Sequence, residues 1–204
     1  MKRGARRAVW LRGTLGVDPL NLIQIILAEG PKIYKNENKT QVLAEVAISV
    51  ALSYVLNFII IYHLPQGGSV TLGSMVPILL LALRRGPIIG IFSGVVFGVL
   101  QMFFGGYWFT IIQVLLDYPV AFACLGLAGF FKKHPLIGVI ISLLGRLIVH
   151  VISGVVFFSE YAPPGQSPLI YSIIYNGSYM LPELIISGIL VYLLIKRGIL
   201  EHNI

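Results

Sequence analysis

The sequence predicts an all-α integral membrane protein with six transmembrane helices. Of its 204 residues, 57% are hydrophobic and only 11% are charged, and the mean hydropathy is +0.89. Soluble domains carry about 25% charged residues, so this composition is typical of a chain that lies mostly within a bilayer. The apolar residues also form several runs of about 20 residues, the length that crosses a membrane, separated by Gly, Pro or charged residues.

The first 40 residues differ from the rest. "MKRGARRAVWLRG" is basic, and "PLNLIQIILAEG" is too short to cross a bilayer. We expect 1–40 to be a basic cytoplasmic tail that either contains an interfacial helix or reflects a start codon assigned upstream of the true N-terminus. We expect 41–198 to form one six-helix membrane domain, and 199–204 to be a cytoplasmic C-terminal tail.

Six apolar spans follow the tail. The second is short, so we expect it to be inclined inside the bundle or accompanied by a structured loop in "HLPQGGSVTLG". The last span is long enough to tilt. Gly, Pro or charged residues bound the spans, which are expected at 43–63, 70–84, 86–105, 109–131, 136–158 and 168–196.

The basic residues alternate between connections. They occur in the N-terminal tail, at Arg84 and Arg85, at Lys132 and Lys133, and after the last span, whereas the other three connections contain none. Cytoplasmic loops of membrane proteins carry the excess of Lys and Arg. The pattern therefore predicts that both termini are cytoplasmic.

The charge and the motifs exclude several classes of function. Lys and Arg outnumber Asp and Glu by 15 to 8, but they are scattered in short clusters, which does not indicate nucleic-acid binding. The single cysteine, Cys124, rules out a disulfide framework. The sequence contains no GxxxxGK[ST], HExxH or GxSxG motif, so we expect neither an enzyme nor a metal site, and no use of ATP by the chain itself.

Three polar residues fall at one depth on three different spans. Asp117 and Asn176 each lie eight residues inside the outer end of their spans, and His150 lies eight residues from the outer end of the fifth. At about 1.5 Å per residue this depth is ~12 Å. Ionisable groups in a membrane usually face a cavity or a partner. The residues therefore predict either an outward-facing pocket for a small polar, cationic molecule, or mutual hydrogen bonds between helices.

Aromatic residues crowd the same outer half of the spans. Some of them would form the belt found at any membrane interface, and others could stack on a flat heterocycle or a cation. The aromatic residues concerned are Trp108, Tyr118, Phe158, Tyr161, Tyr171, Tyr175 and Tyr179.

Two further charged residues lie deeper. Arg146 and Glu183 are at depths of ~18 and ~22 Å from the outer ends of their spans. No chain of other ionisable groups leads from them to the inner face. We therefore expect a structural ion pair between them and not a proton relay.

Small residues mark two helix faces. Gly86, Gly90, Gly94 and Gly98 recur every four residues in the third span, which predicts close packing within the bundle. Ala47 and Ala51 form a weaker small-residue face on the first span.

Three blocks of sequence resemble a known family. "QVLLDYPVAF", "RLIVHVISGVVFFSEYAP" and "SPLIYSIIYNGSYMLPE" are similar, in this order, to the thiamine-specific substrate-binding (S) component of energy-coupling factor transporters. The resemblance covers about 41–198. It implies a six-helix bundle of the S-component type in the cell membrane of a prokaryote, which joins a transmembrane coupling (T) subunit and two ATP-binding subunits.

The resemblance also implies roles for single residues. Asp117, Tyr118, His150, Tyr171 and Asn176 match the family's binding positions, where polar groups hold the aminopyrimidine of thiamine and aromatic side chains enclose its thiazolium ring. Ala47 and Ala51 match the face that docks on the coupling subunit.

The sequence departs from the family pattern in two places. Asp117 stands where the family usually has Glu, and Phe158 stands where Trp is expected, with Trp108 as a candidate for compensating aromatic surface. Two alternatives to thiamine capture remain open: an S component for another vitamin, such as a pyrimidine precursor or riboflavin, and an autonomous secondary transporter in which Asp117 and His150 carry protons.

Overall fold

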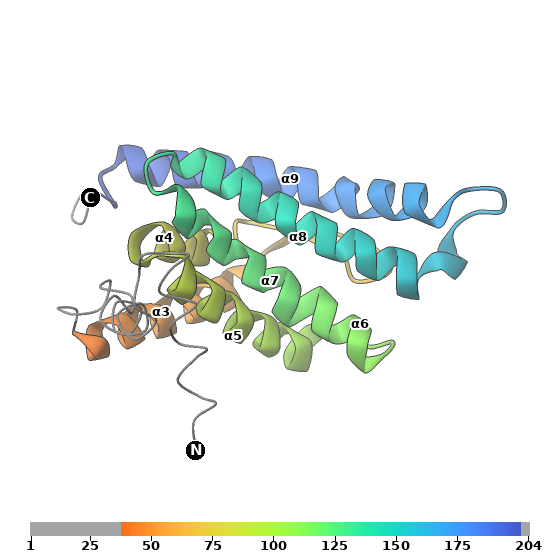
Figure 1. Ribbon diagram of the computed structural model, residues 1–204, viewed down its shortest axis with the longest axis horizontal. Coiled ribbons are helices and arrows are strands. Elements are labelled where there is room, and N and C mark those ends of the chain that lie inside the picture. The colour runs from red at the N-terminus through yellow and green to blue at the C-terminus, as the bar shows by residue number, and fades with distance from the viewer. Residues whose placement is uncertain (1–37, 201–204) are drawn as a thin grey trace, which may run out of the picture. The chain divides into compact units, whose positions relative to one another are not determined.

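The computed structural model describes residues 38–200, which are almost entirely helical (Figure 1). Within residues 38–200, five stretches are long and apolar enough to cross a membrane. They are α3 (Lys39–Asn57), α5 (Pro87–Gly105), the helical segment Ile111–Phe131, α8 (Pro135–Phe157) and α9 (Pro168–Lys196). The all-α membrane fold is therefore confirmed. The expected tails 1–40 and 199–204 fall largely outside the described residues.

The first helix ends earlier than the predicted span 43–63. Helix α3 ends at Asn57, and Ile60–His63 forms strand β1, which pairs antiparallel with β2 (Ser69–Thr71). β-Branched and aromatic residues favour a strand, and the Gly67 and Gly68 pair allows the chain to reverse, with Gly67 at φ +89°. The structured loop suggested for "HLPQGGSVTLG" is thus a β-hairpin.

The second predicted span, 70–84, contains a shorter helix. Helix α4 (Val76–Arg85) has 10 residues, most of them buried, and is too short to cross a bilayer by itself. Gly86 follows at φ +99°, a conformation that favours glycine, and turns the chain directly into α5.

Two of the basic connections lie side by side. Nζ of Lys132 donates to the carbonyl oxygen of Arg84 at 3.1 Å, which joins the end of α4 to the start of the 132–134 turn. Arg85 is buried and pairs with Glu45 of α3, with Nε to Oε2 at 2.6 Å. The contact between Lys132 and Arg84 agrees with the expectation that these two basic connections share one side of the membrane.

The glycines of α5 bring it against the fourth span. A Cβ at Gly94 would collide with the carbonyl oxygen of Phe122, and one at Gly98 would lie 2.6 Å from the carbonyl oxygen of Tyr118. Only glycine permits so close an approach of two backbones. The predicted use of this glycine face, packing within the bundle, is confirmed.

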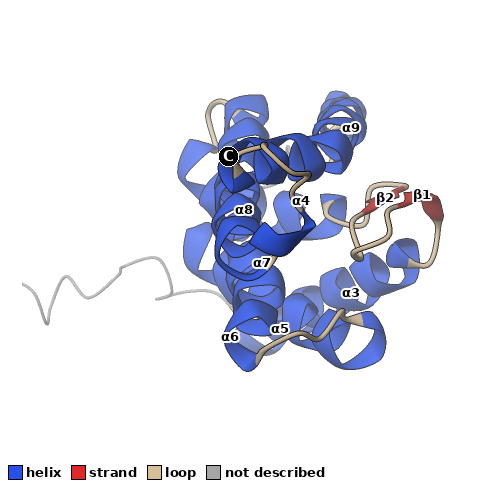
Figure 2. Ribbon diagram, turned by 90° about the vertical axis from the view of Figure 1, so that its right-hand side faces the viewer, coloured by secondary structure: helices blue, strands red, loops and turns tan. Residues whose placement is uncertain are grey.

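The remaining helices complete the frame of the site. Helix α8 packs along both α9 and the fourth span, whose parts are labelled α6 (Ile111–Leu115), η2 (Leu116–Val120), α7 (Ala121–Ala123) and η3 (Cys124–Phe131). The short helix η4 (Ser159–Tyr161) connects α8 towards α9. Figure 2 shows the β-hairpin on the side of the bundle where α3 and α9 lie, and β2 contacts α9.

Candidate functional site: a polar pocket between three spans and a hairpin

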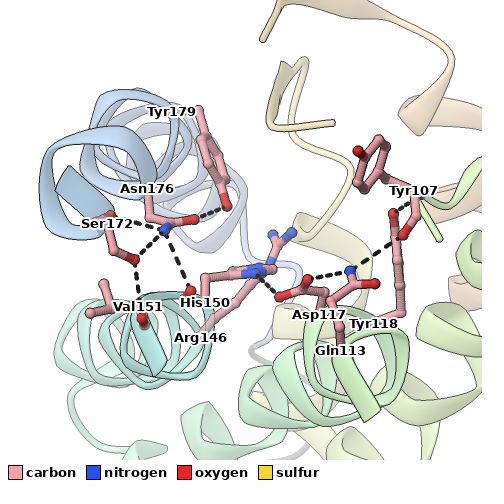
Figure 3. A network of polar contacts seen from close by, with 10 residues as sticks. All are labelled: Tyr107, Gln113, Asp117, Tyr118, Arg146, His150, Val151, Ser172, Asn176 and Tyr179. Carbon is pink, nitrogen blue, oxygen red and sulfur yellow. Dashed lines mark hydrogen bonds and ion pairs between the residues drawn. The ribbon is translucent and has the colours of Figure 1, made fainter. Parts of the chain in front are cut away.

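A pocket lies between the fourth span, α8, α9 and the hairpin. Its polar lining comes from Gln113 and Asp117, from Arg146 and His150, and from Asn176. Figure 3 shows that these side chains converge from different helices. Asp117, His150 and Asn176, which the sequence places at one depth, thus line the same pocket.

A break in the α-helix positions Asp117. The segment Leu116–Val120 is a π-helical turn that contains Asp117, Tyr118 and Pro119. Proline has no backbone N–H and cannot continue the α-helical hydrogen bonds, so the helix widens there, as it often does at functional sites. The same turn faces Gly98 of α5, whose missing side chain leaves room for it.

Both oxygens of the Asp117 carboxylate are hydrogen-bonded. Nε2 of Gln113 donates to Oδ2 at 2.6 Å, and Nδ1 of His150 lies 3.1 Å from Oδ1. The other end of the Gln113 amide accepts from the backbone N–H of Phe109 at 3.0 Å. These bonds fix the carboxylate and leave its side chain 15% exposed.

The contacts of His150 define its tautomer. Nε of Arg146 donates to Nε2 of His150 at 3.2 Å, so Nε2 is the accepting nitrogen and the proton of a neutral ring resides on Nδ1. His150 therefore donates to Asp117. The Arg146 guanidinium also lies 4.0 Å from the centre of the Phe122 ring, a cation–π contact that orients it.

Asn176 is held by α8 and by its own helix. Its Nδ2 donates to the carbonyl oxygens of Ser172 at 2.9 Å and of His150 at 3.4 Å. Its Oδ1 accepts from Oη of Tyr179 at 2.7 Å. Close approach of the two helices depends on Gly154, because a Cβ there would collide with Oγ of Ser172.

Aromatic rings border the pocket on two sides. The Phe158 ring lies about 6 Å from the rings of Tyr107, Phe109 and Tyr161. On α9, Tyr171 stacks on Tyr175 with a centroid distance of 6.1 Å. A side-chain hydrogen bond with Tyr107 raises the pKa of the Tyr161 phenol above its ordinary value.

Most of the predicted binding residues gather here. Trp108 does not: it is 55% exposed, its Nε1 donates to the carbonyl oxygen of Met102 at 2.8 Å, and it is not part of the pocket wall. The predicted residues that do line the pocket are Asp117, Tyr118, His150, Phe158, Tyr171 and Asn176.

The expected ion pair between Arg146 and Glu183 is not formed. Glu183 instead accepts two hydrogen bonds at Oε1, from the backbone N–H and the hydroxyl of Thr71 at 2.6 and 2.7 Å. Arg146 turns to His150 and to Phe122. The depth of the two residues along their helices placed both near the pocket. It did not reveal that Thr71 of strand β2 would donate hydrogen bonds to the Glu183 carboxylate.

Several pocket residues were not predicted from the sequence. Gln113 is the most important, since it binds Asp117 directly, and its position one helical turn before the acid was the available signal. Gln101 binds Asn57, with Nε2 to Oδ1 at 2.9 Å. Neutral amides are less conspicuous than charges in an apolar helix, although burying one without a hydrogen-bond partner is also costly.

The small-residue face predicted on the first span is exposed. Ala47 and Ala51 are exposed on α3, among exposed apolar residues that include Ile48 and Leu52. Within residues 38–200, no group of three or more His, Cys, Asp or Glu side chains is arranged to hold a metal ion.

Comparisons with known proteins agree with this architecture. Residues 43–200 match the family model described as Thiamine transporter protein (Thia_YuaJ). The chain is 37% identical over 179 residues to Thiamine transporter ThiT of Bacillus subtilis, covering 78% of this chain and 93% of that protein. It is 31% identical over 175 residues to Thiamine transporter ThiT of Lacticaseibacillus paracasei, covering 76% and 86% of the two chains.

A solved structure shows the same fold. ThiT from Listeria monocytogenes superposes with a TM-score of 0.71 at 29% sequence identity, covering 78% of this chain and 96% of the other. These relatives are named as bacterial transporters and not as enzymes, and the chain is accordingly a multi-pass protein of a prokaryotic cell membrane. The family that the three sequence blocks resemble is confirmed: the chain belongs to the thiamine transporter protein family.

Proposed function

We propose that the chain is the thiamine-capturing subunit of an energy-coupling factor importer. It takes thiamine from the outside and delivers it through a coupling subunit driven by two ATP-binding subunits. The observation that carries the proposal is the Asp117 carboxylate, fixed by Gln113 and His150 in a pocket bordered by aromatic rings. The names of its relatives supply the ligand.

The pocket is chemically suited to both halves of thiamine. The aminopyrimidine offers N–H donors and ring nitrogens, which match the carboxylate of Asp117 and the carboxamide of Asn176. The thiazolium is a permanent cation, and the rings of Phe158 and Tyr171 can stabilise a cation by about 0.5–2 kcal/mol each. Tyr118 and His150 complete the polar wall.

The proposed partners follow from what the chain lacks and from what it exposes. No ATP-binding motif occurs in the sequence, so hydrolysis would belong to separate subunits. The exposed Ala47 and Ala51 on α3 form a small-residue face that permits close approach of another helix, which supports docking of the coupling subunit there.

Identification of the bound molecule tests the ligand. The protein is purified from cells grown with thiamine, and the small molecule released on denaturation is identified by mass spectrometry. Thiamine is the expected result. Riboflavin or a pyrimidine precursor in its place would indicate an S component for another vitamin.

Reconstitution tests the energy source. In vesicles containing only this chain, a pH gradient should not drive thiamine uptake, whereas co-reconstitution with the coupling and ATP-binding subunits and ATP should. Uptake driven by the pH gradient without partner subunits would identify a secondary transporter and contradict the proposal.

A further inference from the structure

The β-hairpin is attached to one face of α9 at three heights. At its tip, the backbone N–H of Gln66 donates to Oη of Tyr175 at 3.2 Å. Next, Gly68 lies against the Tyr179 ring, so closely that a Cβ would be 2.7 Å from Cδ1. At the inner end, Thr71 binds Glu183. Positions 175, 179 and 183 are each four residues apart and therefore form one stripe along the helix.

The attachment is strongest at the inner end. Thr71 and Glu183 are both 2% exposed, and one carboxylate oxygen accepts two short hydrogen bonds from the same residue. Hydrogen bonds to a carboxylate are about twice as strong as neutral ones, and burial makes their loss costly. The tip has one longer bond to a phenol, and all four residues of β1 are exposed.

Ser74 supports the arrangement. Oγ of Thr71 has a single hydrogen, which the Glu183 carboxylate accepts at 2.7 Å. Oγ of Ser74, 2.8 Å away, is therefore placed to donate to Thr71 in turn. The backbone N–H of Ser74 also points to the Thr71 hydroxyl, at 3.3 Å. At the inner end of the hairpin, both the backbone N–H and the hydroxyl of Thr71 thus have buried polar partners.

The same stripe reaches the candidate binding residues. Tyr179, which packs under Gly68, donates its hydroxyl proton to Asn176. Hairpin residues from Gln66 to Ser69, together with Thr71, form part of the pocket wall. Any movement of the hairpin therefore changes the enclosure of the pocket.

We propose that Glu183 is a positioning residue for ligand binding. It acts through Thr71: it fixes the inner end of the hairpin as a wall of the pocket, so that entry and exit of the ligand open the tip around Gln66 while the Thr71 end stays in place. This inference rests on the proposed function, because it assigns a role in binding the same ligand.

Substitution of Glu183 tests the proposal by the rate of ligand release. Glu183→Leu removes the acceptor, whereas Glu183→Gln keeps a carbonyl oxygen that can accept both bonds. Thiamine dissociation, followed by stopped-flow displacement, should be about tenfold faster or more in Glu183→Leu and close to wild type in Glu183→Gln, with little change in the association rate. Equal dissociation rates in wild type and Glu183→Leu would overturn the proposal.

Hydrogen exchange measures the attachment without any ligand. The Thr71 amide should be protected in wild type and in Glu183→Gln, and should exchange faster in Glu183→Leu, while exchange of the Gln66 amide, which donates to Tyr175 and not to Glu183, should be the same in all three. Protection of Thr71 that is unchanged in Glu183→Leu would also overturn the proposal. If thiamine does not bind wild type at all, the proposed function fails, and this experiment still decides whether Glu183 anchors the hairpin.

Two controls separate positioning from general stability. Ser187 is fully buried one turn further along α9 and makes no side-chain hydrogen bond among the described residues, so Ser187→Ala should leave the dissociation rate unchanged. If Glu183→Leu does not fold, Thr71→Val removes the hydroxyl, with its bonds to Glu183 and Ser74, but keeps the backbone N–H bond to Glu183, and should raise the dissociation rate roughly threefold. No increase in Thr71→Val would count against the proposal.

Discussion

Nδ1 of His150 donates a hydrogen bond to Oδ1 of Asp117 across 3.1 Å, and the direction of this bond is set by Arg146, which occupies the other ring nitrogen. An imidazole from α8 thereby holds a carboxylate from the fourth span within the pocket. The arrangement presents the acid in one orientation before any ligand arrives. Such preorganisation lowers the entropic cost of binding.

Removal of the Asp117 charge should weaken thiamine binding strongly. Asp117→Asn keeps the size of the side chain but loses an ionised acceptor, and hydrogen bonds to charged groups contribute about 1.5–3 kcal/mol. We expect the dissociation constant to rise about 10- to 100-fold, measured by isothermal titration calorimetry. Asp117→Glu, which keeps the charge and lengthens the side chain by one methylene group, should retain binding. Unchanged affinity in Asp117→Asn would show that the carboxylate does not contact the ligand.

Loss of the His150 ring should weaken thiamine binding because Asp117 and Arg146 each lose a hydrogen-bond partner. His150→Ala removes the donor to Asp117 and the acceptor for Arg146, leaving a carboxylate and a guanidinium each with one partner fewer. We expect affinity for thiamine to fall about tenfold, since a buried polar group that loses a partner costs about 1–3 kcal/mol. Equilibrium dialysis with labelled thiamine measures this change. An affinity equal to that of wild type would show that the orientation of Asp117 does not depend on His150.

A larger aromatic ring at the pocket edge should improve binding. Phe158 contacts three other rings and lines the pocket, and Trp has the best π face for a cation. Phe158→Trp should therefore tighten thiamine binding about threefold. Trp108→Phe is the matched control, because Trp108 lies outside the pocket wall, and it should leave affinity unchanged. The reverse result would place the cation near Trp108.

We expect the close packing of the α5 glycines against the fourth span to stabilise the helix bundle. Gly94→Leu forces α5 away from the carbonyl of Phe122, and overpacking of this kind costs about 1–3 kcal/mol or more. Gly105→Leu is the control, because a Cβ there meets nothing within 4 Å. Thermal unfolding in detergent should show a clear decrease in Tm for Gly94→Leu and little change for Gly105→Leu. Equal Tm values would mean that the two segments can separate without cost.

The sequence predicted the long helices well, because hydrophobic length is a direct physical requirement of a bilayer. The helix prediction was wrong within residues 58–75. The apolar Ile60 and Ile61 were included in the first predicted span, but they belong to strand β1 in the structure. Ile60 and Ile61 of β1 are as hydrophobic as the residues of a membrane helix. Their β-propensity becomes decisive only through pairing with Ser69–Thr71, which hydropathy does not measure.

Counting depth along each helix found three polar groups that do line one pocket: Asp117, His150 and Asn176. The depth of a residue does not tell in which direction its side chain points, because that depends on the rotation of the helix about its axis. The hydrogen bonds among the three residues could therefore not be predicted. For the same reason the Arg146–Glu183 pair was wrong. The partner of Glu183 comes from the hairpin, which the sequence did not reveal as a strand.

Calorimetry with thiamine and with its two halves tests whether this pocket recognises the whole vitamin through a fixed carboxylate and aromatic walls. We expect one site per chain, nanomolar-range affinity for thiamine, and far weaker binding of the isolated aminopyrimidine alcohol and the isolated thiazole alcohol. Absence of binding by thiamine, or binding of the pyrimidine half as tightly as the intact vitamin, would contradict this expectation.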